Sequence, residues 1–468
     1  MKNNLLLALI FISASLNLNA TTWLVGASQT YTMPSQVSTL VQNNDTVLID
    51  AGIYNSDVAH WTANNLVLKG VNGLAHLKSN GLSWGDKAIW VIGGNNTTVE
   101  FIEFSLCTST SQNGAGIRQE GLNLTVSHCY FHNNENGILA GALSPCTILV
   151  EYSEFNLNGY GDGYSHNLYI GHIDSLIFRY NYSHHCNIGH ELKSRAEVNI
   201  ILYNRITNEA TGNASREIDL PNGGTSIIVG NIIEQGPNSQ NSGIVGYGLE
   251  GLSNTSPDEL YLVNNTVVND RSAGTFVSIQ NGTALYKAYN NIFAGPGTIL
   301  NGTATSLDTS NNYYGSIVGA GFINATNYDY HLFPFASPVG NATNPGMAGT
   351  FSLTPTLEYA HPTNNSVRPI SGGMDIGAYE YDNTMSILSF QQNKTFSIFP
   401  NPSSGIFYFD PNGISSKVEM YNSFGKLVLV METQNRITFN ESGLADGIYF
   451  LKISQGNNSF IEKIVLQK

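Results

Sequence analysis

The sequence has little charge, few cysteines and almost no long apolar runs. Only 12% of its 468 residues are charged, which excludes a disordered polyelectrolyte and a helical protein rich in Glu and Lys. Lys and Arg number 20 against 34 Asp and Glu, and the net charge of −14 argues against nucleic acid or anionic membranes as partners. What remains is 41% hydrophobic residues interspersed with 47 glycines. This composition favours an all-β fold, and the length, about three times a ~150-residue domain, predicts at least two folding units.

The four cysteines are Cys107, Cys129, Cys146 and Cys186. They form no CxxC pair and no Cys/His spacing typical of a metal site. In an oxidising compartment they would allow three disulfide pairings, and buried thiols are an equal alternative.

The one long apolar run lies at the N-terminus. It follows Lys2, extends from Leu5 to Leu16 and ends near Asn19 and Ala20. This pattern predicts a secretory signal peptide over residues 1–20, because the run is shorter than the ~20 residues that a membrane anchor needs. No other segment is apolar enough to span a bilayer, so we expect an exported chain without a membrane span after cleavage.

Short apolar or aromatic runs recur along the chain with an asparagine near the start of each. The asparagines are Asn181, Asn204, Asn231, Asn265, Asn291 and Asn312, at spacings of 23, 27, 34, 26 and 21 residues. A repeat of this length without a helical period predicts the rungs of a parallel β-helix, whereas propeller blades are ~40–45 residues long. The asparagines would turn one corner of each rung and form an amide ladder. The variable spacings predict loops of different length on one side.

Residues 373–380 read GMDIGAYE. This ending, together with the asparagine rungs, resembles the pectin-lyase-like superfamily of right-handed parallel β-helices. The resemblance implies such a fold over residues 21–382 and says nothing specific about function.

The C-terminal part changes character after a polar linker at residues 383–394. Alternating strands with glycine turns predict a small antiparallel β-sandwich over residues 395–468. The string FPNPSSGIF…YNSFGK…LADGIYFLKI…EKIVLQK closely resembles the C-terminal sorting domain of the type IX secretion system. The resemblance implies a Bacteroidota-type bacterium, the type IX machinery as a partner, passage through the periplasm and outer membrane, and release or attachment at the cell surface.

A basic cluster stands out in the middle of the predicted coil. Five of the eleven histidines lie within residues 165–220, and so does Lys193, the only lysine between Lys87 and Lys287. Apolar residues expected to point inward recur in this region at spacings of 21, 30, 24 and 26 residues: Ile117, Ile138, Leu168, Leu192 and Ile218. Because side chains alternate along a strand, their neighbours are expected to face outward.

Stacked rungs ~4.8 Å apart would align these neighbours in two outward columns. One column holds Tyr169, Lys193 and Asp219, with Arg118 two rungs earlier. The other holds Asn167, Glu191 and Glu217. The expected strand margins carry His166, His190, Arg195 and Arg216.

These groups suit β-elimination on an acidic polysaccharide, which needs a base, a cation for the enolate and an acid for the leaving oxygen. We assign Lys193 as the base, Arg195 or Arg216 as the cation, and Tyr169 or His190 as the acid. The expected substrate-binding residues are Arg118, Asn167, His166, Glu191, Glu217 and Asp219. A polysaccharide lyase acting as a monomer is the favoured interpretation.

Several alternatives stay open. The charged column could be a structural ion-pair ladder. Glu191, Glu217 and Asp219 could gather Ca²⁺, but no Asp-rich calcium loop is present, so no metal or cofactor is assigned.

Other activities on the same fold are also open. A glycoside hydrolase would need a carboxylate pair such as Glu217 and Asp219, although the polygalacturonase pattern is absent. Residues 160–166 loosely resemble the Tyr/Asp/His grouping of alginate-type epimerases, with a different spacing. A non-enzymatic glycan-binding adhesin is the alternative from another class.

Overall fold

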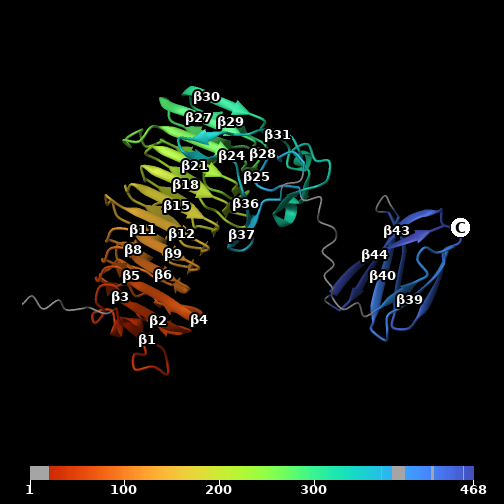
Figure 1. Cartoon of the computed structure of the whole chain (residues 1–468), viewed down its shortest axis with the longest axis horizontal. Coiled ribbons are helices and arrows are strands. Elements are labelled where there is room, and N and C mark those ends of the chain that lie inside the picture. The colour runs from red at the N-terminus through yellow and green to blue at the C-terminus, as the bar shows by residue number, and fades with distance from the viewer. Residues whose placement is uncertain (1–19, 370–371, 382–395, 423–425, 457, 468) are drawn as a thin grey trace, which may run out of the picture. The chain divides into compact units, whose positions relative to one another are not determined.

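The computed structural model describes residues 20–369, 372–381, 396–422, 426–456 and 458–467 (Figure 1). The chain divides into two compact units between Thr384 and Met385. The predicted signal peptide, except for Ala20, and the predicted linker lie outside the described residues. No helix among the described residues is long and apolar enough to cross a membrane.

The first unit is a coil whose turns stack as three parallel sheets (Figure 1). Sheet I contains β1 (Thr22–Val25), β2 (Thr46–Asn55), β4 (Val67–Lys78), β6 (Thr97–Glu100), β9 (Leu124–Ser127), β12 (Thr147–Glu151), β15 (Ser175–Arg179), β18 (Val198–Leu202), β21 (Thr225–Val229), β24 (Glu259–Val263), β27 (Thr283–Tyr289) and β30 (Ala304–Ser310). Sheet II contains the second halves of β2 and β4, then β7 (Ile102–Ser105), β10 (Tyr130–His132), β13 (Glu154–Asn156), β16 (Tyr182–His184), β19 (Arg205–Thr207), β22 (Ile232–Gln235), β25 (Thr266–Asn269), β28 (Ile292–Ala294) and β31 (Tyr313–Gly315). Sheet III contains β3 (Ala59–Trp61), β5 (Ala88–Ile92), β8 (Ala115–Gln119), β11 (Asn136–Ala140), β14 (Leu168–Ile170), β17 (Leu192–Ser194), β20 (Ile218–Leu220), β23 (Gly243–Tyr247), β26 (Thr275–Ile279) and β29 (Thr298–Asn301).

Apolar side chains fill the inside of the coil in stacked columns. Phe104, Phe131 and Phe155 lie on successive strands of sheet II, with ring centroids 4.9 Å apart at each step. Each fully buried side chain of this size contributes roughly 1.5–3 kcal/mol through removal from water. The strands alternate inward and outward residues around this core, and their parallel pairing gives the predicted parallel β-helix.

The predicted asparagine ladder turns the corner between sheets I and II. Nδ2 of Asn181 donates to Oδ1 of Asn204 at 3.1 Å, and the same bond links the later members of the ladder at 2.9–3.0 Å. The residue before each of the first two asparagines has a left-handed backbone, with φ of 60° at Tyr180 and 54° at Tyr203. The ladder also accepts backbone N–H groups that would otherwise be buried without partners.

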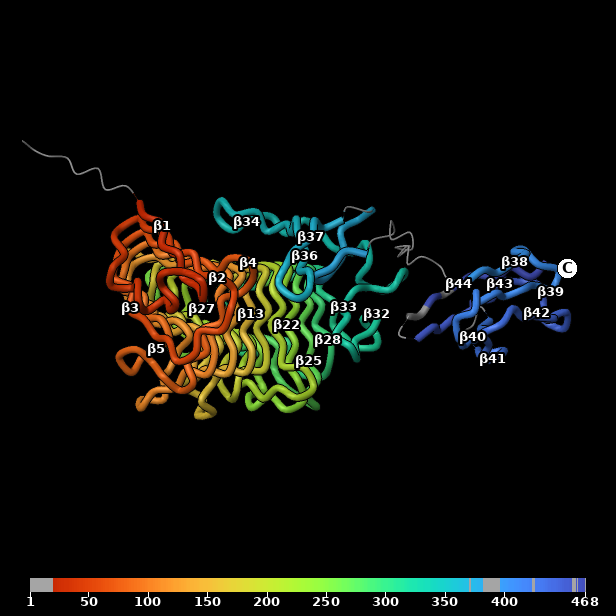
Figure 2. The backbone as a smooth tube through the Cα atoms, turned by 90° about the horizontal axis from the view of Figure 1, so that it is seen from below, coloured from red at the N-terminus to blue at the C-terminus, as the bar shows by residue number. Residues whose placement is uncertain are grey.

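The ends of the coil differ. At the N-terminal end, only Pro34–Gln36 is helical, as the 3-10 helix η1. At the other end, residues 316–369 and 372–381 form a C-terminal strap that runs back beside the coil (Figure 2). Its elements are η2 (Val318–Ala320), β32 (Phe322–Asn324), η3 (Ala325–Asn327), β33 (Asp329–Leu332), β34 (Met347–Ala348), β35 (Phe351–Ser352), β36 (Leu357–Ala360) and β37 (Asn364–Val367).

The GMDIGAYE segment anchors the strap. The backbone N–H of Ala378 donates to Oγ1 of Thr266 at 3.0 Å, and Arg368, only 4% exposed, pairs with Glu380 at 2.9 Å. The motif therefore attaches the strap to sheet II.

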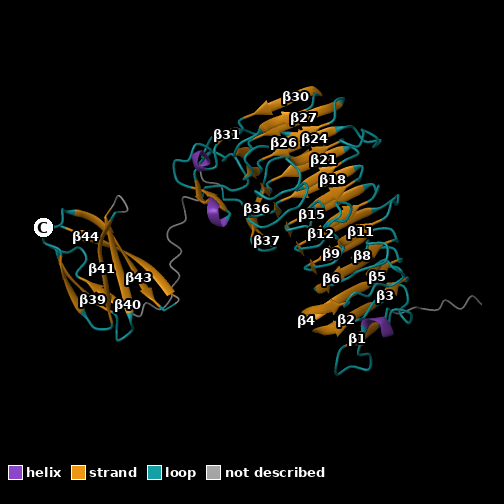
Figure 3. Ribbon diagram, turned by 180° about the vertical axis from the view of Figure 1, so that it is seen from behind, coloured by secondary structure: helices purple, strands orange, loops and turns teal. Residues whose placement is uncertain are grey.

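The second unit is a small antiparallel β-sandwich (Figure 3). One sheet contains β38 (Ser397–Phe399), β39 (Ile406–Asp410) and β42 (Ile437–Asn440), and the other contains β40 (Ser416–Asn422), β41 (Leu427–Thr433), β43 (Gly447–Gln455) and β44 (Asn458–Leu466). Phe407, Met420 and Leu451 lie in its core. The predicted sandwich is thus confirmed.

All four cysteines are free and buried. Burial raises the pKa of Cys129 to about 12, which leaves a thiol that is unreactive at neutral pH. The structure therefore shows buried thiols and not disulfides at these four positions.

Candidate functional site

The outward column predicted on sheet III is present. Tyr169 on β14 lies in register with Lys193 on β17, and Lys193 lies in register with Asp219 on β20. Arg118 on β8 belongs to the same column, but Leu139 lies between it and Tyr169. The Arg118 side chain lies 3.8 Å from Glu120 instead. The structure therefore assembles three members of the column and leaves Arg118 outside the cluster.

The second predicted column is wrong in its direction. Asn167, Glu191 and Glu217 are 0% exposed and point into the coil. Each directly precedes its strand, so the turn rotates its side chain inward before the strand alternation begins. Asn167 donates to Glu191 at 2.5 Å, and Asn208 donates to Glu217 at 3.0 Å.

These inward side chains form hydrogen bonds at the corner of the coil that follows sheet II. Asn134 and Asn158 form an amide ladder there, with a 3.0 Å bond between them. Asn158 donates onward to Asn167, and Glu191 accepts the backbone N–H of Cys186 at 2.8 Å. Asn167 and Glu191 thus continue the ladder at the rung where Cys186 occupies the corner position in place of an asparagine. The suggested calcium ligands Glu191 and Glu217 lie inside the coil while Asp219 lies outside, so the three do not converge.

Two carboxylates hold the central lysine. Nζ of Lys193 lies 2.9 Å from Oε1 of Glu250 and 3.3 Å from Oδ2 of Asp219. Only 11% of the Lys193 side chain and 4% of the Asp219 side chain are exposed, whereas 47% of the Glu250 side chain is. Lys193 is therefore held by Asp219 on the sheet and by Glu250 on a loop.

Arg195 joins the same network from the margin of β17. Its guanidinium bonds Glu250 at 2.6 Å, the Tyr169 hydroxyl at 2.9 Å and Oδ1 of Asn222 at 2.6 Å. Although partial burial opposes the effect, hydrogen bonds from Lys193 and Arg195 lower the pKa of Glu250 to about 2. Glu250 is thus a carboxylate held between two cations.

His166 and His190 stack beside this network, with ring centroids 4.9 Å apart. Nδ1 of His166 accepts the N–H of His190 at 3.0 Å, and Nδ1 of His190 accepts the N–H of Arg216 at 3.1 Å. Burial and the neighbouring charges of Lys193 and Arg216 lower the pKa of His190 to about 3. Burial and the neighbouring His190 and Lys193 also lower the pKa of His166 well below its usual value. Both rings are therefore neutral and carry their proton on Nε2.

Asp219 collects the remaining donors. Oδ1 lies 3.5 Å from Nη1 of Arg216, and Oδ2 lies 3.6 Å from Nε2 of His190. Nε of Arg216 is buried and has no hydrogen-bond partner among the described residues. Arg216, Lys193 and His190 therefore surround one nearly buried carboxylate, while Arg195 pairs with Glu250 and His166 stacks on His190.

Glu250 and Asn222 were not identified from the sequence. They lie in the loops that follow β23 and β20, where no repeat marks them. The available signal was the spacing between Asn231 and Asn265, which at 34 residues is the longest of the ladder and contains the Glu250 loop.

The loop at residues 159–165 leads into β14 and carries two exposed tyrosines. Tyr164 is 84% exposed and Tyr160 is 47% exposed. Asp162 shapes the loop by accepting the N–H of Tyr164 at 2.9 Å.

Comparison with family models identifies the second unit. Residues 397–467 match the model described as the secretion system C-terminal sorting domain. The second unit is a sorting domain. It directs the chain to the type IX secretion machinery, and the protein is secreted to the cell surface or the medium. No curated protein matches the chain closely enough to count as a relative.

Comparison with solved structures concerns the β-helix. The chain is similar to the crystal structure of pectate lyase Pel9A, with a TM-score of 0.51 and 11% sequence identity over 78% of this chain and 97% of that chain. Identity at this level shows a shared fold, and the sorting domain follows that fold as a separate unit. The protein is therefore a secreted parallel β-helix.

Proposed function

We propose that this secreted β-helix binds an acidic polysaccharide at the Lys193 site and cleaves it by β-elimination. The observation that carries the proposal is the gathering of Lys193, Arg195 and Arg216 on one outward face of a chain with a net charge of −14. Cations clustered against the overall charge suit an anionic ligand. A uronate carboxylate is the anion that an extracellular polysaccharide offers.

The internal carboxylate Glu250 indicates where the substrate carboxylate binds. Glu250 reaches Arg195 and Lys193 from a loop at 2.6 and 2.9 Å and is half exposed. A uronate carboxylate has the same geometry and charge, so it can displace Glu250 and bind Arg195 in its place, which releases Lys193 from Glu250. Arg216, whose Nε has no hydrogen-bond partner in the described part of the chain, provides a further donor as charge builds up on the carboxylate.

The chemical steps need one base and one acid. Lys193, released from Glu250 and in its neutral form, takes the proton from the carbon beside the carboxylate. The electron pair left on carbon forms the new double bond as the glycosidic carbon–oxygen bond breaks. The Tyr169 hydroxyl then gives a proton to the leaving oxygen, and the neutral ring of His190 can only donate a hydrogen bond from Nε2–H. His190 acts as a donor rather than as a base, because its Nδ1 lone pair already accepts the Arg216 N–H.

The test is a screen of the full chain against alginate, pectate and glycosaminoglycans. β-Elimination leaves an unsaturated uronide, so ultraviolet absorbance should rise with at least one polymer. Saturable binding without new absorbance on any polymer would replace the lyase with an adhesin. Inversion of uronate configuration without chain cleavage would indicate an epimerase, because that reaction shares only the first proton transfer.

A further inference from the structure

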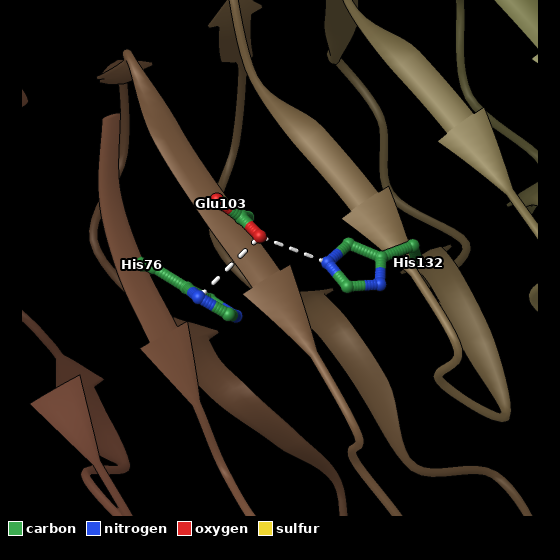
Figure 4. A group of neighbouring side chains, drawn as sticks. All are labelled: His76, Glu103 and His132. Atoms are coloured by element: carbon green, nitrogen blue, oxygen red, sulfur yellow. Dashed lines mark hydrogen bonds and ion pairs between the residues drawn. The ribbon is translucent and has the colours of Figure 1, made fainter. Parts of the chain in front are cut away.

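A second cluster of ligating side chains lies on sheet II, away from the Lys193 site on sheet III. His76 on β4, Glu103 on β7 and His132 on β10 come from three successive rungs (Figure 4). Both imidazole rings turn toward Oε1 of Glu103, with Nδ1 of His76 at 3.4 Å and Nε2 of His132 at 3.0 Å. About a fifth of each side chain is exposed, so solvent ions can reach the group.

The spacing of the three ligand atoms fits a small divalent metal. They all lie within 4.8 Å of one another. Ligands ~2.0–2.1 Å from a tetrahedral zinc ion stand roughly 3.3 Å apart. The two contacts with Glu103 bracket that value, and His76 and His132, whose ligand atoms lie within 4.8 Å, would move closer to bind one ion.

The other nitrogen of each ring already has a partner. Nε2 of His76 lies 2.7 Å from Oγ of Ser105, and Nδ1 of His132 lies 2.8 Å from Oδ1 of Asn133. Metal-binding histidines are held by such outer partners, which fix the tautomer and the ring orientation. Because Nδ1 of His132 is held by Asn133, Nε2 is the ring atom that faces Glu103 and that can bind a metal ion.

We propose that His76, Glu103 and His132 bind one divalent transition-metal ion of the zinc class. Two imidazole nitrogens and one carboxylate oxygen favour zinc over calcium, which prefers six to eight oxygen ligands. Three protein ligands leave a coordination position open to water or to a ligand from solution. Lys78 and Glu154 lie near this group, and Tyr130 stacks on His132 with ring centroids 4.5 Å apart. The site is thus a partly covered position on the coil surface.

The experiment is a calorimetric zinc titration of the untagged, chelator-treated full chain. One zinc ion should bind per chain and raise the thermal midpoint, while calcium should do neither. His76→Ala, His132→Ala and Glu103→Gln should each weaken zinc binding at least about tenfold. His132→Gln, which keeps a polar side chain, should have the same effect if the alanine variant folds poorly.

The matched control is His172→Ala. His172 also pairs with a glutamate, Glu197 at 3.2 Å, but no third ligand is found beside them among the described residues. This variant should bind zinc as the unaltered chain does. Absence of zinc binding by the unaltered chain, or binding that survives all three ligand substitutions, would overturn the proposal.

Discussion

Glu191, Glu217 and Glu234 place three carboxyl groups inside the coil, each with 0% exposure. Burial raises the pKa of Glu191 and of Glu234 to about 8, and it raises the pKa of Glu217 well above its usual value. At neutral pH these residues are therefore mostly protonated. They serve the polar inner corner of the coil and take no part in the cationic outer face.

The interior acids predict a loss of stability in alkali. Because the pKa of folded Glu191 lies above its unfolded value of 4.5, its contribution is complete below about pH 4.5 and is lost as pH rises through about 8. Glu191→Gln keeps a neutral side chain at all pH values. Urea unfolding at pH 5, 7 and 9 should therefore show the variant gaining on the unaltered chain as pH rises, by roughly 1–4 kcal/mol at pH 9. An equal pH dependence of the two proteins would mean that Glu191 is charged in the fold.

At this scale the sequence predicts side chains on strands better than side chains beside them. Tyr169, Lys193 and Asp219 lie on strands, so simple alternation places them correctly. Asn167 and Glu191 lie in the turns before their strands. The alternation of side chains along a strand does not predict the direction of a side chain in a turn. An inward Cys186 where the neighbouring rungs have asparagines was the one available sign that other polar groups fill that corner.

Among the elements of the coil, the Glu250 loop controls access to the cations. It holds a carboxylate on Lys193 and Arg195, and its insertion gives the rung its unusual length. The repeat pattern predicts that such loops exist but not where their side chains reach. Glu250 could therefore be placed only by the folded structure.

Removing the internal carboxylate should strengthen substrate binding. Glu250→Ala frees both cations, and an ion pair with a half-exposed carboxylate is worth about 1 kcal/mol after solvent screening, or about fivefold in affinity. KM for an acidic polysaccharide should fall by about that factor, with little change in kcat. Asp308→Ala is the control, because Asp308 pairs with Lys287 on sheet I, away from the Lys193 site. A higher KM for Glu250→Ala would mean that the loop positions the cations instead of competing for them.

The asparagine ladder should be most important at its centre. Asn231→Ala removes the acceptor for the backbone and side-chain N–H groups of Asn204, both buried. Each orphaned buried group costs about 1–3 kcal/mol, so the unfolding free energy should drop by roughly 2–6 kcal/mol. Asn312→Ala, at the partly exposed end of the ladder, should cost less because water can replace the amide. Equal losses in chemical denaturation would show that the ladder does not act through burial.

At the scale of the whole molecule, the charge distribution and the sorting domain are both consistent with a secreted protein that binds an anionic ligand. The chain is acidic, carries a sorting domain at residues 397–467 and places three cations, Lys193, Arg195 and Arg216, together on one face of the coil. A β-helix provides an extended surface on which residues distant in sequence share a face, as a polymer substrate requires. The repeat spacing was sufficient to predict the β-helix, because each rung repeats the same strands and corners. The C-terminal string was sufficient to predict the β-sandwich. The substrate is not encoded in a repeat, since it depends on loops that differ from rung to rung.

The most direct test of the proposed lyase site is the initial rate of unsaturated uronide formation by Lys193→Arg on the polymer identified in the screen. Arginine keeps the positive charge beside Asp219 and Glu250 but does not give up its proton near neutral pH. The proposal predicts a rate at least ~10²-fold lower, because general-base catalysis is lost, with the thermal midpoint little changed. Lys287→Arg, which alters an ion-paired lysine of another sheet, should keep its full rate. A Lys193→Arg rate within a few-fold of the unaltered chain would contradict the account, because it would leave Lys193 with a structural role only.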